Sequence, residues 1–109
     1  MPLNPYRIMW VVVMFDLPTD TKERQRRAQL FREGLLKRSF RMMQYSVYTR
    51  HAMSREEMET QIEQVRKLIP PEGLVQILHL TDKQFGMIRT FWGRQEQVAR
   101  GDPQQLEMF

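Results

Sequence analysis

The sequence predicts an α+β domain in which an antiparallel sheet is backed by two helices. Apolar, β-branched runs at Ile8–Phe15 and Leu74–Leu80 have the composition of strands. Between them, residues 21–37 and 55–69 carry apolar side chains at helical spacing, and residues 43–49 alternate like a strand with one apolar face. A chain of 109 residues is long enough for one domain of this kind.

The first predicted strand ends in a turn that leads to a helix. Asp16 follows the apolar run, and Pro18 disfavours a helix at the residue before it. Asp20 is a good N-cap, because Glu23 stands three residues later as its partner in a capping box. We therefore expect a helix from about residue 21 to residue 37. Its apolar face would consist of Ala28, Phe31 and Leu35.

The middle of the chain repeats the order of strand and helix. Residues 43–49 form the second predicted strand, and one further short strand fits around residues 49–53. Ser54 and Glu57 have the spacing of a second capping box, directly before the next apolar stripe. The second helix is therefore expected to begin at Ser54.

Two proline residues and a glycine separate this helix from the last strong strand. Pro70-Pro71 ends the helix, and Gly73 leads into residues 74–80. The complete order is β-α-β-β-α-β, which is that of a ferredoxin-like domain. We expect residues 1–92 to form this core, with residues 86–92 as a further candidate strand.

Residues 93–109 form a C-terminal extension of the same single domain. This extension begins with a polar link and ends in a short apolar segment. Such an end gains stability by adding to the edge of a sheet, either its own or that of a partner. The residues of this predicted strand are Leu106, Glu107, Met108 and Phe109.

Composition narrows the possible functions. The 17 basic and 13 acidic residues leave a net charge of +4, which favours polyanionic partners. The absence of cysteine excludes disulfides, thiolate zinc sites and cysteine nucleophiles. The longest apolar run, Ile8–Phe15, is far shorter than the ~20 residues of a membrane span, and no signal-peptide pattern follows it. We expect a cytoplasmic protein without a membrane partner.

Asp16 has two interpretations. An aspartate after a strand often accepts hydrogen bonds from nearby backbone N–H groups. It is also a candidate metal ligand or acid/base residue at the end of the sheet. Mg²⁺ binds six oxygens, however, and the nearest acid, Asp20, is expected to cap the helix. A metal site therefore predicts a symmetric dimer, in which Asp16 of each subunit supplies one carboxylate.

Basic residues are dense in the first predicted helix and the link after it. A solvated helix face is one interpretation of such a cluster. The other is a surface for nucleic acid, because most of these residues are arginine, which makes bidentate phosphate contacts. Without elements that read bases, contact with the backbone and a steep salt dependence are expected. The cluster comprises Lys22, Arg24, Arg26, Arg27, Arg32, Lys37, Arg38 and Arg41.

Five pieces of the sequence, in register, resemble a known family. They are VVVMFDLPTDT with Asp16, the basic helix FREGLLKRSF, the phrase QYSVYTR, the later LHLTDKQF and the short apolar end. The family is the small CRISPR-associated protein of the spacer-acquisition module, known as a metal-dependent endoribonuclease. The first and fourth pieces look most like the branch found in type II systems.

The resemblance implies a ferredoxin-like homodimer whose C-terminal strand, here Leu106–Phe109, crosses to the partner's sheet. It implies that Asp16 is the catalytic residue and that one Asp16 from each subunit binds Mg²⁺. In the acquisition complex the dimer would bridge two dimers of the CRISPR integrase subunit and support the double-stranded DNA of the protospacer. The phosphate contacts would come from Lys22, Arg24, Arg26 and Arg27 as a group.

The family divides on activity. Some members are reported as nucleases on RNA or DNA, so single-stranded RNA is an alternative substrate, whereas in others the aspartate is dispensable for acquisition. A magnesium-dependent phosphodiesterase and a non-catalytic DNA-binding scaffold are therefore both open, and we take the scaffold as the working hypothesis. A ferredoxin-like RNA-binding module and a toxin-type ribonuclease are the alternatives outside the family. The glycine-aromatic phrase of the RNA-binding module is absent from the sequence.

Overall fold

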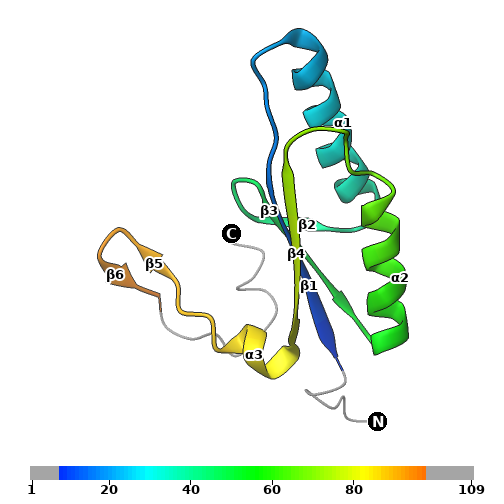
Figure 1. The fold of residues 1–109 in the computed structure, drawn as a ribbon. Coiled ribbons are helices and arrows are strands. Elements are labelled where there is room, and N and C mark those ends of the chain that lie inside the picture. Colours follow the sequence, from blue (N-terminus) through cyan, green and yellow to red (C-terminus); the bar gives the residue numbers. More distant parts are fainter. Residues whose placement is uncertain (1–7, 98–109) are drawn as a thin grey trace.

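A computed structural model of the chain describes residues 8–97. Four antiparallel strands form a sheet in the order β2-β3-β1-β4, and helices α1 and α2 both lie on one side of it (Figure 1). The predicted α+β class and β-α-β-β-α-β order are confirmed. The elements are β1 (Met9–Asp16), α1 (Lys22–Lys37), β2 (Arg41–Gln44), β3 (Val47–Ala52), α2 (Arg55–Arg66), β4 (Leu74–Thr81), α3 (Asp82–Gly86), β5 (Phe91–Trp92) and β6 (Gln95–Glu96).

Alternate residues of β1 form the centre of the core. Met9, Val11 and Val13 are at most 1% exposed, and β1 pairs with β3 on one side and β4 on the other. Full burial of an apolar side chain of this size contributes about 1.5–3 kcal/mol. The strand and both helices are therefore held together mainly by this apolar layer. The helices contribute Phe31, Leu35, Met58 and Val65 to it.

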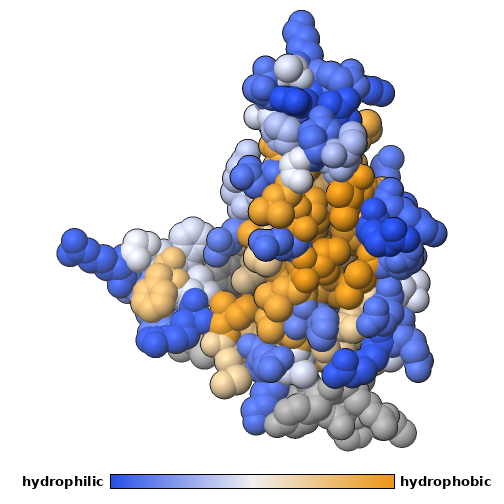
Figure 2. Space-filling model, in the orientation of Figure 1, coloured by the Kyte–Doolittle hydropathy of each residue, from blue (hydrophilic) through white to orange (hydrophobic). Residues whose placement is uncertain are grey.

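The other face of the sheet is not covered by α1 or α2. We call this surface the open face. Figure 2 views the molecule with β4 in front, and apolar side chains gather there along β4 and toward α2. Strand alternation and register place on it Trp10, Val12, Met14 and Asp16 of β1, Val47, Thr49 and His51 of β3, and Leu74, Gln76, Leu78 and Leu80 of β4.

The short helix α3 covers one end of the open face. The ring of Phe85 stacks on the ring of Trp10 with 4.0 Å between centroids. The indole Nε1 of Trp10 donates a hydrogen bond of 2.7 Å to Asp82. Thr81 caps the helix, and its capping box with Gln84 is complete. The end of the open face that carries Asp16 lies at the other end of β1.

The first helix begins one residue later than the sequence predicts. Thr21, not Asp20, is the N-cap, and its hydroxyl accepts a hydrogen bond from the backbone N–H of Arg24. Residues 19–21 are all able to cap a helix, so residue type alone does not identify which of them is the N-cap. Asp20 instead pairs with the Arg24 side chain at 3.0 Å, so the predicted box between Asp20 and Glu23 is wrong.

The single strand predicted at residues 43–49 is a hairpin. Strand β2 ends at Gln44, and the chain turns at Tyr45 and Ser46, where Ser46 has a φ of 62°. Val47 then begins β3, which includes most of the predicted short strand at 49–53. The alternating pattern continued through the turn, which has none of the glycine, asparagine or proline that usually marks one.

The structure differs from two further expectations, one about the start of α2 and one about residues 86–92. Ser54 is the N-cap of α2 as predicted, but the Glu57 side chain accepts from the N–H of Met53. Residues 87–90 are not a strand. Strand β5 pairs with β6 in a small hairpin that spans Trp92, the expected boundary between the core and the C-terminal extension. The predicted strand at Leu106–Phe109 lies outside the described residues. Within residues 8–97, no helix is long and apolar enough to cross a membrane.

Candidate metal centre and nucleic-acid interface

Asp16 is the last residue of β1 and is exposed. It lies opposite Leu74, at the end of the open face. Its carboxylate accepts no hydrogen bond and forms no ion pair with any residue in the range 8–97. The interpretation of Asp16 as a turn-capping residue therefore has no hydrogen bond to support it.

The backbone of Asp16 is held by the turn that precedes β4. Gly73 has a φ of +95°, which L side chains rarely adopt. A Cβ at this position would lie 2.9 Å from the carbonyl oxygen of Asp16 and 2.8 Å from Cδ2 of Leu17. Only glycine allows the turn to approach the end of β1 so closely. The position of Asp16 thus depends on a residue 57 positions away in the chain.

The donor set at Asp16 suits Mg²⁺ but is incomplete in one chain. Carboxylate oxygens are the ligands that Mg²⁺ prefers, and the ion needs six oxygens in total. In the part of the chain that the structure describes, no group of three or more His, Asp or Glu side chains could hold a metal ion. Asp20, the nearest acid in sequence, is paired with Arg24. One Asp16 carboxylate therefore supplies only part of the oxygen ligands that Mg²⁺ requires.

The four predicted phosphate-binding residues fall into two pairs. Arg27 donates to Glu72 through Nε at 3.0 Å and through Nη2, and its Nη1 donates to Glu23 at 3.0 Å. The Nε of Arg24 lies 3.6 Å from Glu72. Both arginines are therefore engaged by the carboxylate of Glu72, which precedes the turn at Gly73. We call these three residues, Arg24, Arg27 and Glu72, the Glu72 cluster.

Asp20 pairs with Arg24, a member of the Glu72 cluster, and this pairing shifts the pKa of both residues. Its carboxylate accepts two hydrogen bonds of 3.0 Å from Nη1 of Arg24. This hydrogen-bonded guanidinium lowers the pKa of Asp20 below its usual range, and the same pair raises the pKa of Arg24. Arg24 thus binds an acid on each side, which reduces the charge it presents to solvent.

Lys22 and Arg26 form the exposed pair. Arg26 is 67% exposed and reaches only 4.0 Å from Glu23. Lys22 is exposed at the first turn of α1, where the positive end of the helix dipole adds to its charge. The role of Glu72 had no signal in the sequence, because this acid lies 45 residues from Arg27.

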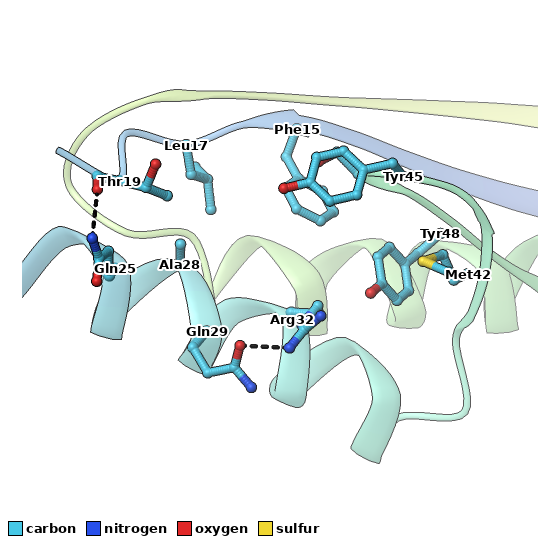
Figure 3. A pocket seen from close by; sticks show the side chains of 11 residues that line it. Phe15, Leu17, Thr19, Gln25, Ala28, Gln29, Arg32, Met42, Tyr45 and Tyr48 are labelled. Carbon is cyan, nitrogen blue, oxygen red and sulfur yellow. Dashed lines mark hydrogen bonds between the residues drawn. The ribbon is translucent and has the colours of Figure 1, made fainter. Parts of the chain in front are cut away.

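A groove of about 200 Å³ lies between α1 and the β2–β3 hairpin (Figure 3). Sequence reasoning missed it, because no local pattern predicts that these elements meet. Aromatic and apolar side chains form its inner surface, and amide and guanidinium groups of α1 line one side. The lining residues are Phe15, Leu17, Thr19, Gln25, Ala28, Gln29, Arg32, Met42, Tyr45, Ser46 and Tyr48.

These observations define a single ferredoxin-like unit whose central strand ends in an uncommitted carboxylate beside a basic helix. A family model described as "CRISPR associated protein Cas2" matches residues 9–88. The chain belongs to this family, as the resemblance predicted. The match is to the family as a whole, and the type II branch stays a prediction.

Relatives of the chain carry the same family name. It is 41% identical over 107 residues to the "CRISPR-associated endoribonuclease Cas2" of Flavobacterium psychrophilum, covering 98% of this chain and 93% of the relative. It is 44% identical over 101 residues to the protein of that name from Parvibaculum lavamentivorans, covering 93% and 100%. A solved structure, "Crystal structure of cas2", matches with a TM-score of 0.56 at 16% identity, covering 87% and 97%, and supports the fold alone.

Proposed function

We propose that two copies of this chain form a symmetric dimer that binds the backbone of duplex DNA. In this role the dimer supports a protospacer between two integrase dimers during CRISPR spacer acquisition. The proposal starts from membership of the Cas2 family. It requires a surface for a second copy and a basic surface that remains exposed in the dimer.

The observation that carries the proposal is the composition of the open face. Leu74 and Leu78, both on the edge strand β4, are 55% and 42% exposed, so two large apolar side chains of the open face are in contact with solvent. Pairing this face with its copy would bury both leucines. Because Asp16 ends the same face, a two-fold axis through it would bring two carboxylates toward each other.

The basic surface of the dimer would be supplied first by Lys22 and Arg26. Both are exposed on α1, which lies on the side of the sheet away from the open face. Pairing of the open faces would therefore leave these cations accessible and double their number. Contacts between these cations and backbone phosphates depend on charge and not on base sequence. Binding should therefore weaken steeply as the salt concentration rises.

A second candidate function, magnesium-dependent phosphodiester hydrolysis, is favoured by the uncommitted carboxylate of Asp16. Two such residues would hold one Mg²⁺, and the ion would supply activation of water and stabilisation of phosphorane charge when bound. The relatives named endoribonuclease support this role, with RNA as the substrate that their name indicates.

The dimer is tested by replacing Leu78 with arginine and measuring the molecular mass in solution. Leu78→Arg should give a monomer, because it places two charges in the shared apolar face. Leu36→Arg is the matched control, since Leu36 is 50% exposed on α1 and lies outside the open face. A wild-type monomer, or a Leu78→Arg dimer of normal stability, would show that the open face is not the interface.

The two functions are separated by Asp16→Asn and by the double variant Lys22→Glu/Arg26→Glu. The scaffold role predicts that Asp16→Asn keeps duplex binding and spacer acquisition, whereas the charge reversal impairs both. The nuclease role predicts that Asp16→Asn and chelation of Mg²⁺ each abolish cleavage of RNA or DNA. Cleavage at full rate after the Asp16 substitution would instead identify a contaminating nuclease.

A further inference from the structure

The groove beside α1 has a regular wall. Gln25, Ala28, Gln29 and Arg32 have the spacing i, i+3, i+4 and i+7, which places them on one flank of the helix. Arg27, by contrast, belongs to the flank that contacts Glu72. The helix therefore presents two different basic flanks, and the one with Arg32 faces the groove.

Tyr45 covers this groove from the hairpin side. It lies in the turn between β2 and β3 and is 91% exposed, and its ring extends over the lining residues (Figure 3). Below it, Phe15 and Tyr48 are stacked with 5.6 Å between ring centroids. An aromatic ring with so much exposed area contributes little to the core, but it is available to stack on a planar ligand.

The opposite side of the groove offers polar groups in fixed positions. Arg32 donates to Oε1 of Gln29 at 2.6 Å, and Gln25 donates to the carbonyl oxygen of Thr19 at 2.9 Å. A guanidinium has five N–H donors, and this hydrogen bond uses one of them. Arg32 is exposed, so its other donors face the solvent at the mouth of the groove.

We propose that this groove binds one unstacked nucleobase of a single-stranded segment. The base would stack on Tyr45, and Arg32 would contact the adjoining phosphate. An aromatic platform beside a cation is the usual means of binding single strands. The inference rests on the proposed function in one respect, because it requires that the chain binds nucleic acid.

The size and chemistry of the groove favour a base over a peptide. About 200 Å³ is below the roughly 300–1,000 Å³ of pockets for drug-sized ligands, so it suits a single flat ring system. Amide and guanidinium groups match the edges of a base and a phosphate. Paired bases in a duplex are stacked inside the helix and do not reach such a groove. The site therefore distinguishes single strands or frayed ends from continuous duplex.

The experiment compares Tyr45→Ser with Tyr45→Phe in the full chain. Binding of a fluorescent oligo-dT strand and of a blunt duplex is measured by anisotropy at one salt concentration. Tyr45→Ser should weaken single-strand binding by about 5-fold to 150-fold, the range found for base stacking on aromatic residues, and leave duplex binding unchanged. Tyr45→Phe should retain single-strand binding, because the phenyl ring also stacks.

Two controls make the result specific. Phe91→Ser removes an aromatic residue that is 52% exposed on β5, away from the groove, and should leave single-strand binding intact. An oligonucleotide with abasic sites should bind wild type as weakly as Tyr45→Ser binds the normal strand, with no further loss when the two changes are combined.

The inference is overturned if Tyr45→Ser binds the single strand like wild type. The groove would then be a binding site for an apolar side chain of a protein partner. It is also overturned if the variant loses single-strand and duplex binding equally. If wild type binds neither probe, the proposed function fails and the inference fails with it. If wild type binds the duplex with steep salt dependence while Tyr45 has no effect, only the inference fails.

Discussion

Replacement of Glu72 by glutamine tests whether this residue restrains nucleic-acid binding. The substitution removes the carboxylate that engages Arg27 and Arg24 in the Glu72 cluster. A phosphate and this carboxylate compete for the same guanidinium donors, because both accept bidentate hydrogen bonds. We therefore expect Glu72→Gln to bind duplex DNA more tightly than wild type.

The structure sets the expected size of two effects of Glu72→Gln, one on the salt dependence of DNA binding and one on stability. In Glu72→Gln, Arg24 and Arg27 each lose one acidic partner but keep another, Asp20 and Glu23 respectively. At most two more phosphate contacts per chain become available, so the slope of log K against log salt should become steeper by no more than about 1.8 per chain. The side chains of Glu72 and Arg27 are 25% and 31% exposed, between a surface pair and a buried one. Loss of this pair should lower the free energy of unfolding by about 1 kcal/mol.

The assay is a salt titration of duplex binding by anisotropy, between about 50 and 200 mM salt, where such slopes are measured. Urea unfolding of the same protein measures the stability change. Glu59→Gln is the matched control, since Glu59 is exposed on α2 and changes the net charge equally. An unchanged salt slope in Glu72→Gln would show that Glu72 does not restrain DNA binding. An equal increase in duplex affinity in Glu59→Gln would show the same.

Other predictions concern stability and titration. Gly73→Ala should lower the free energy of unfolding by more than about 1 kcal/mol in urea, because of its positive φ and the close contact with Asp16; a neutral effect would show that the turn is not constrained. Thr21→Ala should cost about 1 kcal/mol as the true N-cap, and Asp20→Ala clearly less, in the same assay. The lowered pKa of Asp20 means that its pairing with Arg24 contributes at neutral pH and is lost as acid titrates through the lowered pKa. The carboxyl ¹³C shift of Asp20 should report that low midpoint, and Arg24→Gln should raise it.

Local pattern was enough to predict the main elements. The apolar runs of β1 and β4 and the stripes of α1 and α2 depend on neighbouring residues alone, so composition and period predicted these elements. The same dependence on neighbours explains the errors. The turn at Tyr45 and Ser46 interrupts an alternating pattern without a glycine, asparagine or proline, and three adjacent residues able to cap a helix left the start of α1 ambiguous.

Residue patterns alone predicted strands β1 and β4, the two helices and the place of Asp16 at the end of β1. They could not predict which cations are paired with Glu72, which leucines are exposed or where a groove forms. These features depend on residues that are far apart along the chain. Arg27 meets Glu72, and Gly73 meets Asp16, because packing of the helices on the sheet brings separate segments together. Tyr45 and Arg32 share one groove for the same reason.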